Sequence, residues 1–191
     1  MRLNLSTKKG FTLIELMVSI SIFTMVMIVA VGSVFAIVDA NKKTHSIKSV
    51  MTNLNFALES MTRDIRVGTM YGCDTAVGTP GDCQSGGDTF HFKANRDVDG
   101  NGLADDFIEY SLGQENGVWK IMKGVYPAGI VFPITAAEIH IESMKFYVTG
   151  TRADDGVQPK AVITIRGYAG VSGTLSKFNI QTTVSERALD I

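Results

Sequence analysis

The chain has 191 residues, enough for one membrane helix and one modest globular domain. Its 18 basic and 19 acidic side chains give a formal net charge of −1 at pH 7. This balance argues against a broad nucleic-acid-binding face, which would require clustered basic residues, so we expect no nucleic-acid partner. The mean hydropathy of +0.15 is high because the N-terminal stretch is apolar, not because the whole chain is.

The most informative stretch is residues 8–38. Lys8 and Lys9 precede Gly10, and the 28 residues that follow carry a single charge, Glu15. At about 1.5 Å per residue, a helix of that length reaches roughly 42 Å, more than the roughly 30 Å of a hydrocarbon core. Residues 11–38 are therefore predicted to be a transmembrane helix.

Glu15 is an unusual residue for such a helix. A carboxylate inside a membrane segment costs at least a few kcal/mol and usually marks a functional position with a specific partner. The sequence Lys-Lys-Gly-Phe-Thr-Leu-Ile-Glu-Leu at residues 8–16 resembles the type IV prepilin signal, which type IV pilins share with the pseudopilins of type II secretion. The resemblance implies that a prepilin peptidase cleaves after Gly10 and that the new N-terminal residue, Phe11, is methylated.

Cleavage after Gly10 would create an amine about one helical turn from Glu15. In a bundle of such helices, the amine at Phe11 of one subunit would neutralise Glu15 of its own or a neighbouring chain, and this pairing would fix the axial register of assembly. The resemblance implies four partners: the peptidase, other pilin or pseudopilin subunits, an inner-membrane assembly platform and membrane lipid. The alternatives are an ordinary anchor with an acidic residue near its end, and a secretory signal peptide. A signal peptide is disfavoured because its apolar core is usually 7–15 residues long, much shorter than the apolar stretch at residues 11–38.

The basic residues of the leader predict the orientation. Arg2, Lys8 and Lys9 favour a cytoplasmic N-terminus in the inner membrane, so everything beyond Val38 would face the periplasm or the cell exterior, in a pilus or pseudopilus. In that setting Cys73 and Cys83, which lie in a glycine-rich stretch, are expected to form a disulfide. Two free thiols are the alternative.

The helix is predicted to continue beyond the membrane to about Val67. Apolar residues recur at three- and four-residue steps, as in an amphipathic helix, and Gly68 is a plausible end. The chain therefore divides into a leader (1–10), the transmembrane half of the helix (11–38), its amphipathic half (39–67) and a β-rich globular domain (68–191). The residues of the expected apolar stripe are Ile47, Val50, Met51, Leu54, Leu58, Met61 and Ile65.

Strands are predicted after a glycine-rich loop at 68–88. Alternating patterns favour strands at 89–94, 107–112, 118–123, 138–148, 161–168 and 177–184, whereas 126–133 reads as irregular. The expected fold class is α+β, with a long N-terminal helix packed on a C-terminal antiparallel β-sheet domain; this order is similar to the pilin fold. The hairpin and the ending at residues 181–187 also resemble, more loosely, the J-type minor pseudopilins and related minor pilins.

Residues 97–106 form an acidic loop that suggests a calcium site. Oxygen side chains at alternate positions, with a glycine at the turn, suit a hard cation such as Ca²⁺. The loop resembles the short Asp-x-Asp-x-Asn-Gly-x-x-Asp calcium loops between strands; it is not an EF-hand, because Ile108 stands where the bidentate glutamate belongs. The expected ligands are Asp97, Asp99, Asn101, the Leu103 carbonyl and Asp105.

Two alternatives remain for this loop. A shifted frame starts at Asn95 and uses Asp97, Asp99 and Asp106, but it places Gly102 poorly. The other alternative is a solvated turn without metal, because Asn, Asp and Gly are common turn residues.

No catalytic pattern is found, so an enzyme is not expected. The pattern favours a pilin-like structural subunit, processed and then assembled through its N-terminal helix, as a minor component of a type IV pilus or a secretion pseudopilus. The alternatives are a single-pass anchored binding domain that does not polymerise, and a minor pilin that acts as an adhesin or in DNA uptake.

Overall fold

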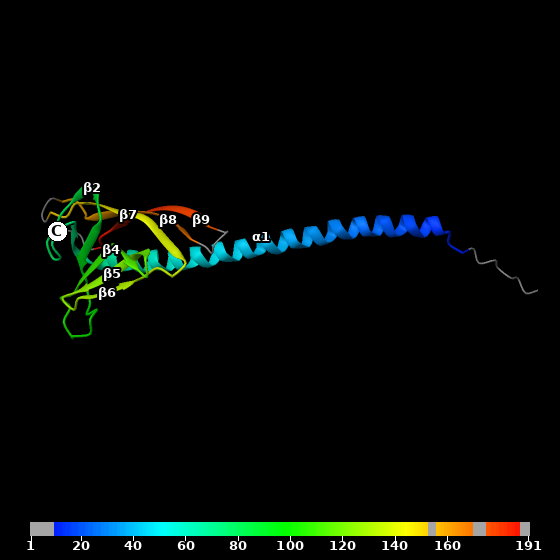
Figure 1. The fold of residues 1–191 in the computed structure, drawn as a ribbon. Coiled ribbons are helices and arrows are strands. Elements are labelled where there is room, and N and C mark those ends of the chain that lie inside the picture. Colours follow the sequence, from blue (N-terminus) through cyan, green and yellow to red (C-terminus); the bar gives the residue numbers. More distant parts are fainter. Residues whose placement is uncertain (1–9, 153–155, 170–174, 188–191) are drawn as a thin grey trace, which may run out of the picture. The chain divides into compact units, whose positions relative to one another are not determined.

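The computed structural model describes residues 10–152, 156–169 and 175–187 (Figure 1). The predicted leader before Gly10 lies outside these ranges. The described residues form one long helix followed by nine strands, which confirms the predicted α+β class. The elements are α1 (Leu13–Val67), β1 (Thr69–Cys73), β2 (Cys83–Gly87), β3 (Thr89–Lys93), β4 (Phe107–Glu115), β5 (Val118–Tyr126), β6 (Ile130–Pro133), β7 (Ile139–Thr149), β8 (Lys160–Ala169) and β9 (Ser176–Ser185).

By its internal contacts the chain divides into two units, Met1–His45 and Ser46–Ile191. The first unit holds the apolar part of α1. The second holds the rest of α1 and all the strands, and it has the hydrophobic core.

The buried stripe of α1 in the second unit largely follows the predicted spacing. Leu54, Met61 and Ile65 are completely buried, whereas Met51 is 43% exposed, so the expectation that Met51 belongs to the stripe is wrong. Ala57 takes part instead, because it lies one turn from both Leu54 and Met61. The stripe buries the helix against the strands, which fixes this part of α1 on the sheet domain.

The end of α1 is set by Gly68. Its backbone N–H donates to the carbonyls of Asp64 and Ile65, at 3.1 and 3.0 Å. A Cβ atom at Gly68 would stand 2.2 Å from the ring of Phe92, so a larger residue does not fit without a shift. The hydroxyl of Tyr71 donates to the Ile65 carbonyl at 2.6 Å, which satisfies one of the last carbonyls of the helix.

The strands form two antiparallel sheets. One has the order β1-β3-β4-β5-β6 and the other the order β2-β7-β8-β9. The β4–β5 hairpin closes through Asn116 and Gly117, which both have positive φ values, 51° and 78°, as a two-residue turn of this kind requires. Because the turn takes only these two residues, β4 and β5 are longer than the predicted strands at 107–112 and 118–123.

Three strands were not predicted. β1 and β2 lie in the glycine-rich stretch that reads as a loop, and β6 lies in the segment that reads as irregular. They have only four or five residues each, and β1, β2 and β6 are all edge strands. Short edge strands depend on a neighbouring strand for their pairing, and such a partner leaves little trace in local sequence.

Aromatic side chains occupy the centre of the core. Tyr71, Phe90, Phe92, Tyr110 and Phe146 are almost fully buried, and their neighbouring ring centroids are 5.3 to 6.3 Å apart. Each fully buried phenylalanine contributes about 1.5–3 kcal/mol relative to an exposed one. The rings come from both sheets, so they join the two sheets in one core.

Candidate functional sites

The start of α1 holds the residues that the prepilin resemblance singles out. Gly10 and Phe11 precede the helix, and Phe11 is 86% exposed. The hydroxyl of Thr12 accepts a hydrogen bond from the Glu15 N–H and donates one to its carboxylate, both at 3.4 Å. Thr12 therefore caps the helix. Glu15 lies in the first turn, where a negative charge interacts favourably with the helix dipole. Thr12 was not predicted to contribute, although the Thr-x-x-Glu spacing is a known capping signal.

The helix beyond Glu15 is suited to lipid. Residues 16–38 carry no charge, and α1 is the one helix among the described residues that is long and apolar enough to cross a membrane. None of its most apolar part is buried within the chain, unlike the core helix of a soluble protein. The hydroxyl groups in this segment each donate to the carbonyl four residues earlier, so they would not be unsatisfied in lipid. These are Ser19, Ser21, Thr24 and Ser33.

A charge cluster, buried except for the Arg96 side chain, lies where α1 meets the five-stranded sheet. The Asp64 carboxylate accepts hydrogen bonds from Lys123 at 2.6 Å, from Arg96 at 3.0 Å and from the Tyr110 hydroxyl at 3.2 Å. Burial, and secondly the Asp64 charge, raise the pKa of Tyr110, so the hydroxyl stays protonated and donates. All four side chains are partnered within the cluster, which indicates a structural rather than a catalytic role.

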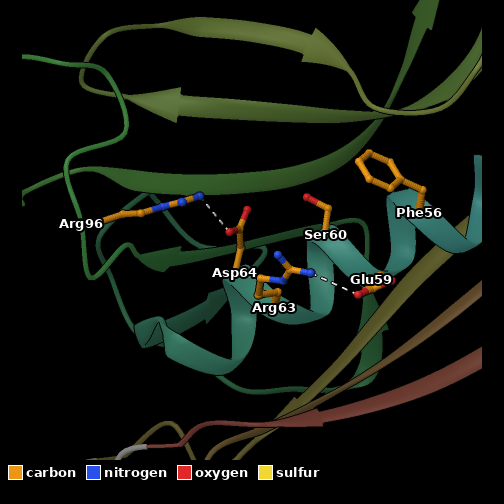
Figure 2. A pocket seen from close by; sticks show the side chains of 6 residues that line it. All are labelled: Phe56, Glu59, Ser60, Arg63, Asp64 and Arg96. Atoms are coloured by element: carbon orange, nitrogen blue, oxygen red, sulfur yellow. Dashed lines mark hydrogen bonds and ion pairs between the residues drawn. The ribbon is translucent and has the colours of Figure 1, made fainter.

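Figure 2 shows a surface pocket beside this cluster, lined by Phe56, Glu59, Ser60, Arg63, Asp64 and Arg96. Its charged groups are paired with one another: Arg63 with Glu59 at 3.1 Å, and Arg96 with Asp64. No nucleophile and base lie within hydrogen-bonding distance among these lining residues. The pocket therefore does not indicate catalysis.

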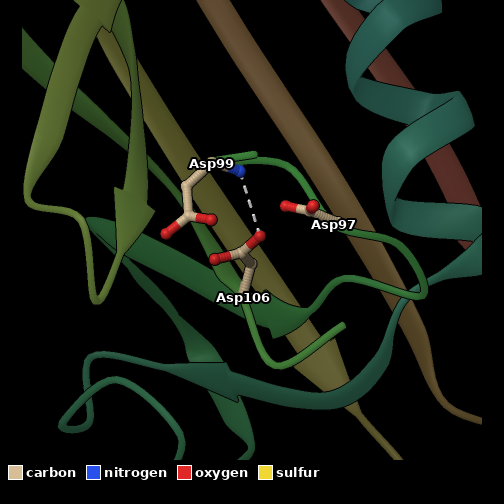
Figure 3. A group of neighbouring side chains, drawn as sticks. All are labelled: Asp97, Asp99 and Asp106. Atoms are coloured by element: carbon tan, nitrogen blue, oxygen red, sulfur yellow. Dashed lines mark hydrogen bonds between the residues drawn. The ribbon is translucent and has the colours of Figure 1, made fainter. Parts of the chain in front are cut away.

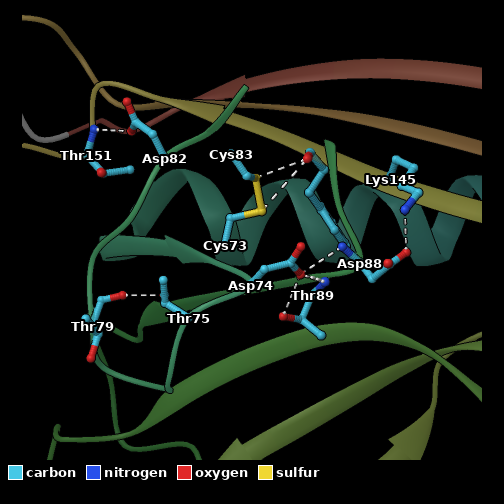
Figure 4. Close-up of a disulfide and its surroundings, with 11 residues drawn as sticks. Cys73, Asp74, Thr75, Thr79, Asp82, Cys83, Asp88, Thr89, Lys145 and Thr151 are labelled. Atoms are coloured by element: carbon cyan, nitrogen blue, oxygen red, sulfur yellow. Dashed lines mark hydrogen bonds and ion pairs between the residues drawn. A yellow bond between two sulfur atoms is a disulfide. The ribbon is translucent and has the colours of Figure 1, made fainter. Parts of the chain in front are cut away.

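Cys73 and Cys83 form a disulfide, the pairing that the sequence predicts (Figure 4). Cys73 ends β1 and Cys83 begins β2, so the bond joins an edge strand of one sheet to an edge strand of the other. The neighbouring Asp74 carboxylate accepts from the N–H groups of Asp88 and Thr89, both at 2.9 Å. These contacts hold the segment between the two cysteines against the start of β3.

Beneath this segment lies His91, on β3. It is completely buried, and burial lowers its pKa, with the neighbouring Thr79 carbonyl acting in the opposite direction. His140 lies on β7 and stacks on Tyr168 of β8, with ring centroids 4.6 Å apart. The two histidines thus take part in packing on different sheets.

The acidic loop between β3 and β4 brings three carboxylates together. Asp97, Asp99 and Asp106 each place one oxygen within 4.8 Å of the others (Figure 3). These are the acidic residues of the shifted frame, whereas the favoured frame uses Asp105, which is exposed and is not in this group. The Asn101 side chain accepts from the Leu103 N–H at 2.7 Å.

The fold and the N-terminal segment together define an α+β chain anchored in a membrane by its N-terminal helix. Residues 5–31 match the family described as the prokaryotic N-terminal methylation motif. The chain therefore carries a prepilin-type signal of the kind found in type IV pilins and pseudopilins, which implies processing by a prepilin peptidase and assembly with other pilins. No curated protein and no solved structure matches the chain.

Proposed function

We propose that this chain is a pilin-like structural subunit. A prepilin peptidase cleaves it after Gly10, Phe11 is methylated, and the N-terminal helix carries the subunit into a type IV pilus or a type II secretion pseudopilus as a minor component. The sheet domain is then the exposed part of the subunit.

One observation carries this proposal. The methylation motif at residues 5–31 includes the first turns of α1, the apolar side chains of residues 16–38 are exposed, and the single charge of residues 11–38 is Glu15 in the first turn. An anchor that only holds a domain at a membrane has no use for a carboxylate at this position, which costs a few kcal/mol in lipid. A subunit that packs its helix against other helices can pair this carboxylate.

The pairing partner is the amine that cleavage creates at Phe11. In a low-dielectric bundle a paired charge is tolerated where a lone charge is not. Pairing between Glu15 of one subunit and the amine of its neighbour would set the axial step of the filament. Lys8 and Lys9 keep the N-terminus in the cytoplasm until cleavage, where the assembly platform of the inner membrane would receive the subunit.

Replacing Glu15 by alanine tests this role. We expect Glu15→Ala to insert into the membrane as the wild type does, because the substitution makes the segment more apolar. We also expect it to be absent from sheared or pelleted filaments, because its neighbour's amine has no partner. Immunoblots of the membrane and filament fractions from the same cells measure both quantities.

Glu59→Ala is the matched control. Glu59 lies on the same helix but outside the apolar segment, in an exposed ion pair with Arg63. This variant should reach filaments at the wild-type level. If Glu15→Ala also does so, the proposed role of Glu15 is refuted. If the wild type itself is absent from filaments, a membrane-anchored binding domain that does not polymerise explains the chain better.

A further inference from the structure

The acidic loop has the geometry of a cation site. One oxygen from each of Asp97, Asp99 and Asp106 lies within 4.8 Å of the other two. Two oxygens that ligate the same Ca²⁺ at 2.3–2.6 Å are at most about 5 Å apart, so these three oxygens are close enough to bind one ion. Figure 3 shows the three carboxylates turned toward a shared space. Arg96, the basic residue next to the loop in sequence, is bound to Asp64 and does not neutralise them.

Asp106 provides an independent sign of a ligand. Its side chain is completely buried, and its Oδ2 accepts hydrogen bonds from the N–H groups of Val98 and Asp99, at 2.6 and 3.1 Å. Its other oxygen, Oδ1, is buried and has no hydrogen-bond partner among the residues that the structure describes. A buried carboxylate oxygen without a partner is costly, and a bound cation is one of the few groups that satisfies it.

The other two carboxylates are already held in place by the loop. Asp97 accepts from the Gly100 and Gly102 N–H groups, at 2.7 and 2.8 Å, and Asp99 accepts from the Asn101 N–H at 3.0 Å. Each carboxylate oxygen has a second lone pair, so these bonds leave it able to bind a metal.

We propose that Asp97, Asp99 and Asp106 bind one Ca²⁺ ion. The assignment to calcium follows from a donor set of carboxylates on an irregular loop, because Mg²⁺ demands a near-ideal octahedron and keeps most of its waters. Of the other ligands that the sequence suggests, we retain the Asn101 amide and the Leu103 carbonyl and leave out Asp105, which is exposed and lies outside the carboxylate group. This proposal is independent of filament assembly.

The ion would join the start of the loop to its end. Asp106 immediately precedes β4, and its carbonyl already accepts from the Ala94 N–H at 2.8 Å, just after β3. Calcium would thus close the loop that carries Arg96 to the buried Asp64 on α1. Binding should therefore stabilise the whole sheet domain rather than the loop alone.

The test uses the full chain in detergent, stripped with EDTA and dialysed. Calorimetric titration with CaCl₂ should give a Kd of about 10⁻⁴–10⁻³ M, the range of extracellular modules. The melting temperature should rise by about 5–10 °C at a calcium concentration of about one hundred times the Kd. An absence of both signals would overturn the proposal, and an equal response to MgCl₂ would overturn the assignment to calcium.

Three variants identify the ligands. Asp106→Asn should weaken calcium binding by at least about tenfold, because it removes a charged ligand. Asp97→Asn should have the same effect, and since Asp97 is exposed it provides the test should Asp106→Asn not fold. Asp105→Asn is the control, and it should bind calcium like the wild type. Loss of binding in Asp105→Asn alone would overturn the ligand set.

Discussion

Asp64 shows how one residue holds α1 to the sheet. Its carboxylate and the Lys123 ammonium are about one-tenth exposed, and their atoms are 2.6 Å apart. Removing one member of a buried ion pair lowers the free energy of unfolding by more than the intact pair contributes to it, because the other charge is left unpaired in a low-dielectric site. The stability of the helix–sheet contact should therefore be sensitive to either side chain alone.

We expect Asp64→Ala to lower the free energy of unfolding by about 3–5 kcal/mol, because Lys123 is left buried without its counter-charge. Urea unfolding of the full chain in detergent measures the loss, followed by the fluorescence of Trp119, the single tryptophan of the chain. Glu59→Ala, which breaks an exposed ion pair, should change the free energy by less than about 1 kcal/mol.

The double variant Asp64→Leu with Lys123→Met separates pairing from packing. It removes both buried charges and should recover roughly half of the loss or more, since an apolar pair can replace a buried ion pair. A double variant as unstable as Asp64→Ala would contradict this explanation of the cluster.

Two of the acidic residues of α1, Glu15 and Asp64, differ in how well the sequence reveals their roles. Glu15 is conspicuous because it interrupts an apolar run directly after Lys-Lys-Gly. Asp64 reads as an ordinary surface residue of an amphipathic helix, and its partner Lys123 is 59 residues away in the sequence. Its role depends on tertiary contacts that no local pattern contains. The same holds for Asp106, whose burial distinguishes it from the adjacent, exposed Asp105.

At the scale of the elements, the disulfide links two edge strands that are not paired with each other. β1 pairs with β3 and β2 with β7, and these pairings belong to different sheets. The register of both pairings shifts along these strands. The Cys73–Cys83 bond therefore strengthens a part of the domain where backbone pairing is short and irregular.

We expect the paired substitution Cys73→Ala with Cys83→Ala to lower the free energy of unfolding by roughly 2–3 kcal/mol, because the reduced chain regains the entropy of a short loop. Urea unfolding with and without reductant measures it: reductant should destabilise the wild type by a similar amount and leave the variant unchanged. Equal stability of wild type and variant without reductant would contradict a stabilising role for the bond.

The elements with a strong periodic pattern were predicted best. α1 and the strands β3, β4, β7, β8 and β9 each have apolar residues at regular spacing on one face, which is visible in the local sequence; β5 was predicted as the second strand of the hairpin with β4. The strands β1, β2 and β6 have no such face, and the division into two sheets depends on which strands meet in space. The prediction of a single sheet domain was therefore correct in class and incomplete in topology.

At the scale of the whole molecule, the chain combines a membrane segment with a domain that has its own core. The apolar part of α1 finds no partner within the described part of its own chain, whereas the part beyond His45 is packed under the strands. The methylation motif lies at the membrane end and supplies the processing signal. Membrane anchoring and a prepilin-type signal follow from these features, and assembly into a filament is the function we propose for them.

Mass spectrometry of the N-terminus is the most direct test of this account. The protein is isolated from the membranes and filaments of cells that express the assembly system, and its first residue is determined. We expect the chain to begin at an N-methylated Phe11. A chain that still begins at Met1, or that begins beyond the apolar part of α1, would contradict the account.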